Sequence, residues 1–86
     1  MNRTKRIKTI LDKNIIDFSI NILDNSNSHK GHNNFDGNGE THIIIELKKN
    51  SNYKYNIDRL EIHRKINLLL ENEFKMGLHS LQIKII

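Results

Sequence analysis

Hydrophobic residues recur at two different spacings along the first 24 residues, and each spacing predicts its own element. Ile7, Ile10 and Leu11 lie at helical spacing among charged residues, which predicts an amphipathic helix over residues 3–13. Apolar and polar residues then alternate as far as Asp24, as in a β-strand that buries one face. The apolar members of this alternation are Ile16, Phe18, Ile20 and Ile22. We expect the helix to cover the sheet to which this strand belongs.

A polar segment separates this strand from a second one. Residues 25–39 are rich in asparagine, serine, histidine and glycine, with Phe35 as their only large apolar residue, which predicts a flexible loop. Residues 41–47 are apolar and β-branched enough for a strand. Because a loop without a helix joins the two strands, we expect them to pair antiparallel as a hairpin.

The pattern from residue 58 onward predicts a long helix. Asp58 can cap a helix over residues 59–74, Gly77 can end it, and a helical turn can precede it. Its expected apolar stripe consists of Leu60, Ile66, Leu69, Leu70 and Phe74. A polar connection, residues 48–56, separates this helix from the second strand.

A third strand is predicted at the end of the chain, where Leu81, Ile83 and Ile85 share one face within residues 78–86. The predicted order is thus helix, strand, strand, helix, strand. This order favours an α+β fold, a three-stranded sheet covered by helices on one face. Because 86 residues provide one core, we expect a single domain over residues 1–86, with residues 25–39 as its flexible histidine-containing loop.

Composition excludes several kinds of site. The chain has no cysteine, so it offers no disulfide, no thiol nucleophile and no thiolate of its own for zinc or for an iron-sulfur cluster. Its 14 lysines and arginines against 10 acidic residues give a net charge of +4, which permits nucleic-acid binding without requiring it. We do not expect an enzyme, because no nucleophile motif, phosphate-binding glycine loop or carboxylate pair is arranged in the sequence.

The sequence favours a protein that is soluble and intracellular. No apolar stretch approaches the roughly 20 residues of a membrane-spanning helix, and the N-terminus lacks the apolar core of a secretory signal. We expect a monomer in the bacterial cytoplasm, with the mitochondrial matrix as the less favoured compartment. The run of Arg3, Lys5, Arg6 and Lys8 is also compatible with a transit peptide. We favour solvation of the first helix as the use of these charges, some of which can also face an acidic partner.

Five histidines are the only good transition-metal ligands in a chain without cysteine. His29 and His32 lie in the predicted loop, where they are either adjustable ligands or ordinary polar surface residues. We expect His42, at the start of the second strand, and His63, in the first turns of the long helix, to be structural. His79 lies between that helix and the last strand, where its side chain can stand at the sheet edge.

Two imidazoles, one from the loop and one from the junction before the last strand, are able to ligate one iron of a 2Fe-2S cluster. The second iron needs thiolates, which this chain lacks. The cluster interpretation therefore requires a partner protein or a thiol cofactor. A zinc site made by this chain alone is less favoured, because no carboxylates accompany the histidines at an obvious ligand spacing.

Seven short fragments follow one another in a set order from residue 24 to residue 81. They are Asp24-Asn25-Ser26, His29-Lys30-Gly31-His32, Glu40-Thr41-His42, His63-Arg64-Lys65-Ile66-Asn67, Leu69-Leu70, Glu73-Phe74 and Gly77-Leu78-His79-Ser80-Leu81. This ordered set resembles the BolA-like family over nearly the whole chain, with the last fragment as its strongest part. The resemblance implies a class II KH-like fold (αββααβ), which agrees with the α+β order expected from the pattern.

The resemblance also implies a partner and a cofactor. BolA-like proteins pair with monothiol glutaredoxins of the CGFS type, and the pair holds a 2Fe-2S cluster. Its ligands are a glutaredoxin cysteine, glutathione, a C-terminal histidine, and a histidine or cysteine of the loop between the first two strands. His79 matches the C-terminal histidine and His29 the loop position, with His32 as the alternative loop ligand. The implied role is iron-sulfur cluster trafficking or iron sensing.

The chain departs from the family pattern just before and at the start of the long helix. The family's aromatic-x-Gly becomes Tyr53-Lys54-Tyr55-Asn56, and its Arg-His-Arg becomes Ile62-His63-Arg64. These departures concern surface contacts in this region rather than the fold.

A KH-like DNA-binding transcriptional regulator is the alternative interpretation, suggested by the topology, the net charge and bacterial relatives that act as transcription factors. Its candidate contact residues are Lys48, Lys49, Lys54, Arg59 and Arg64. The GxxG backbone clamp is absent, and only Tyr53 and Tyr55 offer base stacking nearby. The glutaredoxin partnership is therefore the favoured interpretation.

Overall fold

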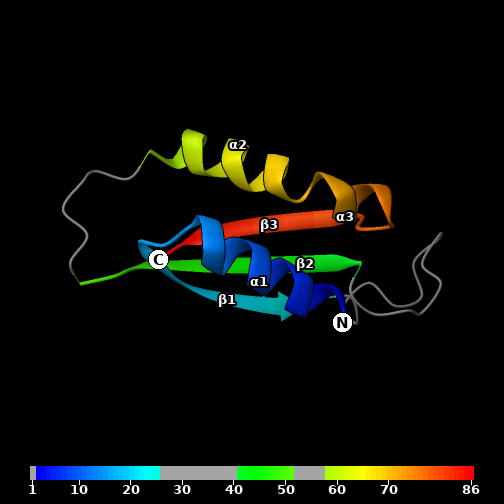
Figure 1. Ribbon diagram of the computed structural model, residues 1–86, viewed down its shortest axis with the longest axis horizontal. Helices are drawn as coiled ribbons and strands as arrows, with labels where there is room; N and C mark the ends of the chain where they lie inside the picture. The colour runs from blue at the N-terminus through cyan, green and yellow to red at the C-terminus, as the bar shows by residue number, and fades with distance from the viewer. Residues whose placement is uncertain (1, 26–40, 52–57) are drawn as a thin grey trace.

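The computed structural model describes residues 2–25, 41–51 and 58–86 and arranges them in the order αββααβ (Figure 1). The elements are α1 (Arg3–Asn14), β1 (Phe18–Asp24), β2 (His42–Lys49), α2 (Arg59–Leu69), α3 (Glu71–Lys75) and β3 (Ser80–Ile85). This is the expected α+β fold. Residues 26–40, most of the predicted loop, and residues 52–57, where a helical turn is expected before α2, lie outside the described residues.

The three strands form one sheet in the order β1-β2-β3, so β2 is the central strand. β1 and β2 pair antiparallel, which confirms the predicted hairpin, and β3 joins the other side of β2 in parallel. The registers place Ile45 of β2 opposite both Ile22 and Ile83. The apolar residues of the three strands therefore share one face of the sheet, where Ile43, Ile45 and Leu47 are almost completely buried.

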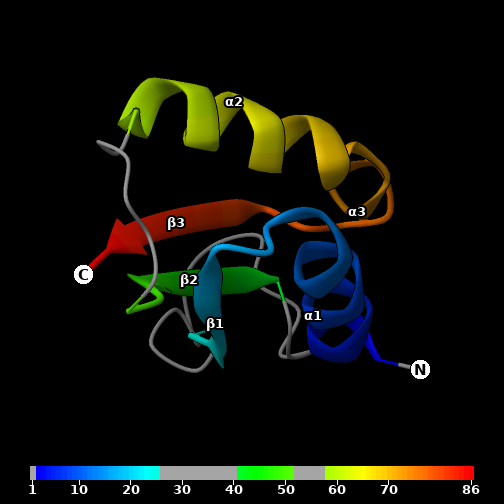
Figure 2. The ribbon, with the colours of Figure 1, turned by 60° about the vertical axis from the view of Figure 1, so that its left-hand side comes forward.

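The helices cover this apolar face, with α1 alongside β1 and α2 alongside β3 (Figures 1 and 2). The side chain of Asn2 caps α1 by accepting a hydrogen bond from the Lys5 N–H at 3.0 Å. Ile7 and Leu11 are fully buried and Ile10 packs against the core, so the predicted stripe of this helix is confirmed. Within the described ranges, no helix is long and apolar enough to cross a membrane.

The long helix predicted over residues 59–74 is two helices. The backbone leaves the helical path at Leu70, which has φ −101° and ψ 14° and lies between α2 and α3. Ile66 and Leu70 are buried as predicted, but Phe74 beyond the break is 36% exposed. Glu73 takes the inward position instead, because arginines of α1 neutralise its charge there, as described below.

Two further apolar residues lie on faces other than those predicted. Leu60 is 60% exposed, because it lies about 200° of helical turn from Ile62, which packs against the core instead. Ile16 is 72% exposed, since it lies in the turn between α1 and β1, where strand alternation does not yet apply. Ile15 is buried in its place, and its N–H donates to the Leu11 carbonyl at 2.7 Å.

A glycine turn connects α3 to β3. Gly77 has a φ of 114°, a conformation that residues with a Cβ rarely adopt. The Leu78 N–H donates to the Glu73 carbonyl at 2.9 Å, and the Gly77 N–H to the Phe74 carbonyl at 3.3 Å. This pair of bonds is the Schellman arrangement, which confirms Gly77 as the helix end. The inward residues of β3 are those predicted, Leu81, Ile83 and Ile85.

Candidate functional site

The glycine turn brings His79 to the surface at one end of the sheet. Leu78 is buried and anchors the chain, whereas His79 next to it is exposed. The backbone N–H groups of His79 and Ser80 both donate to the Thr41 carbonyl, at 2.8 and 3.1 Å. His79 is therefore fixed through its backbone while its imidazole remains accessible, at the sheet edge where the sequence predicts it.

His42, the first residue of β2, lies beside His79. The centroids of the two imidazole rings are 5.9 Å apart and the ring planes meet at 81°, an edge-to-face contact. His42 Nδ1 also lies 2.9 Å from Thr41 Oγ1, in a hydrogen bond whose donor depends on the imidazole tautomer. The contact between the histidines arises because β2 and β3 are parallel neighbours, with His42 opposite Ser80. Alternation patterns do not specify which strands are neighbours, so the sequence predicts a structural His42 without this contact.

His42 and His79 form one corner of the sheet, which we call the histidine corner. The residues on either side of the segment that carries the other candidate ligands lie at this corner. The N–H of Asn25, which follows β1, donates to the His42 carbonyl at 2.8 Å. Asn25 and Thr41, the described residues on either side of the segment 26–40, therefore both lie at this corner. The candidate ligands within the segment are His29 and His32, which lie outside the described residues.

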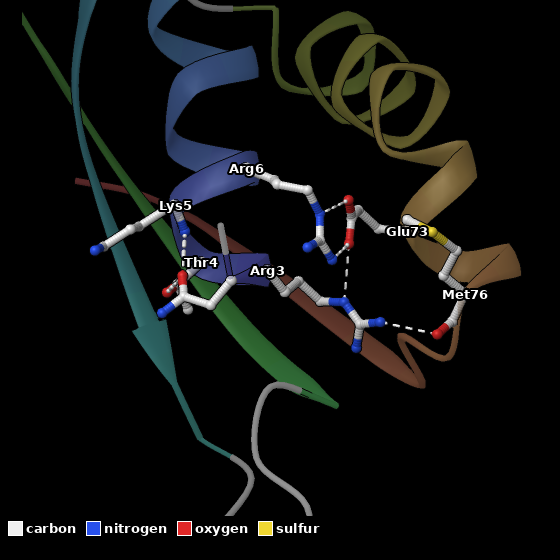
Figure 3. A network of polar contacts seen from close by, with 7 residues as sticks. Arg3, Thr4, Lys5, Arg6, Glu73 and Met76 are labelled. Atoms are coloured by element: carbon white, nitrogen blue, oxygen red, sulfur yellow. Dashed lines mark hydrogen bonds and ion pairs between the residues drawn. The ribbon is translucent and has the colours of Figure 1, made fainter.

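A buried carboxylate ties α1 to this corner (Figure 3). Glu73, 2% exposed, accepts hydrogen bonds from Nε of Arg3 at 2.9 Å and from Nε and Nη2 of Arg6 at 2.8 and 2.9 Å. Arg3 Nη2 also donates to the Met76 carbonyl at 2.9 Å, one residue before Gly77. Chiefly through the hydrogen bond from Arg6, and despite the opposing effect of burial, the pKa of Glu73 lies below its ordinary value.

These contacts correct the expectation that the basic residues of α1 serve to solvate it. Arg3 and Arg6 instead pair with a carboxylate that lies 70 and 67 residues further along the chain. Lys8 behaves more as expected, because it pairs with Asp12 one turn away on the exposed side of the helix, at 2.7 Å. The two arginines thus fix α1 against the turn that leads to His79.

The candidate nucleic-acid contacts lie away from the histidines. Lys48 and Lys49 end β2, about 20 Å along the strand from His42. Both are exposed, as are Arg59 and Arg64 on α2, and α2 begins over the same end of the sheet (Figure 1). Lys54, the remaining candidate, lies outside the described residues.

The histidine corner contains imidazoles but no complete metal-binding set. Within residues 2–25, 41–51 and 58–86, no three histidine, aspartate or glutamate side chains lie together in a way that could hold a metal ion. His63 is half-buried on α2, where its carbonyl accepts a hydrogen bond from Asn67 Nδ2 at 2.7 Å. A metal bound beside His79 would therefore need ligands from residues 26–40 or from another molecule.

A family model and a bacterial relative match most of the chain. The model, described as BolA-like protein, matches residues 11–86. The relative is a Sinorhizobium protein named "Uncharacterized protein in cobS 5'region", which is 35% identical over 66 residues. That match covers 76% of this chain and 69% of the relative.

Two solved plant structures share the fold. The BolA domain of SufE1 from Arabidopsis thaliana has a TM-score of 0.75 and 30% identity, over 99% of this chain and 91% of that chain. BolA1 from Arabidopsis thaliana has a TM-score of 0.73 and 27% identity, over 99% of this chain and 90% of that chain. The family model and the shared arrangement of helices and strands agree, and this chain belongs to the BolA-like family.

Proposed function

We propose that this chain binds a monothiol glutaredoxin of the CGFS type and shares a 2Fe-2S cluster with it, in iron-sulfur cluster trafficking or iron sensing. The observation that carries the proposal is the exposed His79, fixed by its backbone at the histidine corner, where Asn25 and Thr41 on either side of residues 26–40 also lie. His79 supplies one ligand, and His29, with His32 as the alternative, supplies the other.

The donor groups of the chain fit one iron of such a cluster. Imidazole nitrogens replace thiolates on one of the two irons in clusters of mixed ligation, and the replacement raises the reduction potential. The chain has no cysteine, so the second iron is left to the thiolates of glutaredoxin and glutathione. The bound cluster supplies an iron-sulfur unit that can be delivered or sensed. The residues of this chain bind it and orient the imidazoles.

In this proposal the chain is a binding module and not a catalyst. It is a monomer in the bacterial cytoplasm until it meets its glutaredoxin partner. Its contribution is to replace part of an all-thiolate ligand set by imidazoles, which changes both the potential and the lability of the cluster.

The test is a titration of the chain into a 2Fe-2S-loaded monothiol glutaredoxin with glutathione, followed by visible absorption and circular dichroism. We expect a new spectrum with the wild-type chain, and its loss with His79→Ala. One of the variants His29→Ala and His32→Ala should also lose it, which identifies the loop ligand.

His63→Ala is the matched control, because His63 is half-buried on α2 and should leave the mixed-cluster spectrum unchanged. A His79→Ala chain that gives the wild-type spectrum would overturn the proposed ligand set. Absence of any complex between the wild-type chain and the loaded glutaredoxin would overturn the partnership itself.

DNA binding is the second candidate function, supported by the exposed Lys48, Lys49 and Arg59 at the other end of the sheet from His79. Its measurement is fluorescence anisotropy with duplex DNA at about 50 mM and about 200 mM salt. Binding that disappears at the higher salt marks non-specific attraction to phosphates. Sequence preference that survives there, and that weakens in a Lys48→Gln, Lys49→Gln double variant, would favour the regulator.

A further inference from the structure

Thr41 holds two groups of the histidine corner at once. It is 9% exposed and lies directly before β2. Its carbonyl accepts the backbone N–H of His79 at 2.8 Å, and its hydroxyl is hydrogen-bonded to Nδ1 of His42 at 2.9 Å. One buried residue therefore fixes the backbone of His79 and the ring of His42 relative to each other.

His42 is the more constrained of the two histidines. It is half-buried in the central strand, and its carbonyl accepts the Asn25 N–H at 2.8 Å. His79 is exposed, so its ring can keep a single rotamer only if a contact holds it there. The edge-to-face contact with His42, at 5.9 Å and 81°, is such a contact.

We propose that His42 is a positioning residue for His79, whose imidazole it holds by ring contact in the orientation needed to meet a metal. A ligand that is already oriented loses less side-chain entropy when it binds. Residues that orient metal-ligating histidines commonly change metal affinity when they are replaced, without touching the metal themselves. This inference rests on the proposed function for the role of His79 as a ligand, whereas the orientation of the ring can be tested without it.

The first experiment measures the His79 side chain in the isolated chain by NMR at fixed pH. Three-bond couplings across the Cα–Cβ bond report its rotamer populations, and its ring carbon-bound protons report the neighbouring ring. We expect His42→Ala to average the His79 couplings towards free rotation. His42→Phe should keep a single dominant rotamer, because phenylalanine retains an aromatic ring and suits a strand position.

His63→Ala is the control for this measurement and should leave the His79 couplings unchanged. Amide spectra of all three variants verify that each chain is folded, so a lost contact is distinguished from a lost structure. Couplings of His79 that are the same in His42→Ala and in the wild-type chain would overturn the inference, whatever the glutaredoxin experiments show.

The second experiment measures the affinity of the mixed cluster complex with glutaredoxin. We expect His42→Ala to weaken it by about 10-fold to 100-fold, as for other residues that orient metal ligands. His42→Phe should recover most of the loss, because the ring contact is restored without a nitrogen. A His42→Phe chain as defective as His79→Ala would overturn the positioning role and make His42 itself a ligand.

The two experiments separate the inference from the proposed function. If the wild-type chain forms no mixed cluster but His42→Ala still frees the His79 rotamer, the proposed function fails and the positioning of the ring stands. If the mixed cluster forms and depends on His79 but is indifferent to His42→Ala, the proposed function stands and the positioning role fails.

Discussion

Arg6 donates two hydrogen bonds to the carboxylate of Glu73, from Nε to Oε2 at 2.8 Å and from Nη2 to Oε1 at 2.9 Å. The two-point geometry matches the planar guanidinium to the planar carboxylate, and it joins the first helix to the last helix before β3. Arg3 adds a third bond to the same carboxylate and a fourth to the backbone of the turn at Met76. The position of the corner that carries His79 thus depends on charge pairing as well as on apolar packing.

Replacing Glu73 by glutamine should lower the free energy of unfolding by about 2 kcal/mol, because two arginines then face a neutral amide. This expected loss is smaller than that for a fully buried ion pair, because the Arg6 side chain is 35% exposed and partly screened by solvent. Urea denaturation at pH 7 measures the change. Glu71→Gln on the same helix is the control, because its pair with Lys75 is exposed and 3.4 Å long, and should change stability by less than about 0.5 kcal/mol. Equal effects of the two substitutions would contradict a stabilising role for the ion pairs of Glu73.

Stability should fall in acid partly through Glu73. Its pKa lies below the ordinary value of 4.5 in the folded chain, mainly through the hydrogen bond from Arg6. The stability that it contributes is therefore fully present above the unfolded-state pKa and is lost as the pH falls through the folded-state value. Between about pH 7 and about pH 3, a range that contains the ordinary carboxyl pKa values, the free energy of unfolding should drop less steeply in Glu73→Gln than in the wild-type chain. Parallel profiles for the two chains would show that this carboxylate does not carry the effect.

Replacing Gly77 by alanine should cost about 1 kcal/mol of stability through the backbone alone. The φ of 114° is unfavourable for any residue with a Cβ, yet an added Cβ would meet only Arg3 Nη2, at an ordinary 3.7 Å. Thermal unfolding measures the change, and Gly77→Asn should lose less, since asparagine tolerates positive φ better. A loss of several kcal/mol would point to a clash that the structure does not contain.

The stability of the fold should be sensitive to truncation of Leu70, the residue between α2 and α3. Its side chain is 0% exposed at the break, so Leu70→Ala should leave a cavity and destabilise the fold by about 2–5 kcal/mol. Leu68→Ala is the matched control, because Leu68 is 73% exposed and its loss should change stability by less than about 0.5 kcal/mol. Chemical denaturation of the two variants side by side makes the comparison. Equally mild effects of the two substitutions would contradict the burial of Leu70.

Local periodicity predicts the elements of this fold well. The stripe of Ile7 and Leu11, the alternation in β1 and β3, and the helix end at Gly77 all follow from residues close together in the sequence. The break at Leu70 does not, because Ile66, Leu70 and Phe74 keep the spacing of one uninterrupted helix.

The remaining differences depend on residues far apart in the chain. Glu73 is buried only because Arg3 and Arg6 reach it from the other end of the sequence, so a local pattern assigns the inward position to Phe74 instead. His42 meets His79 only because β3 pairs in parallel with β2, a choice that no single segment records. Both the surface position of His79 and its candidate role could be predicted from the sequence, whereas its neighbour could not.

The hydrogen bond between the Asn25 N–H and the His42 carbonyl closes the hairpin independently of what lies between the two residues. The entropy of closing a connection grows only with the logarithm of its length, so that doubling the number of intervening residues costs about 0.6 kcal/mol. Insertions and replacements there can accumulate during evolution at little expense to the folded sheet. Residues between Asn25 and Thr41 can therefore change in number and kind while the backbone hydrogen bonds from His79 and Ser80 to the Thr41 carbonyl stay in place.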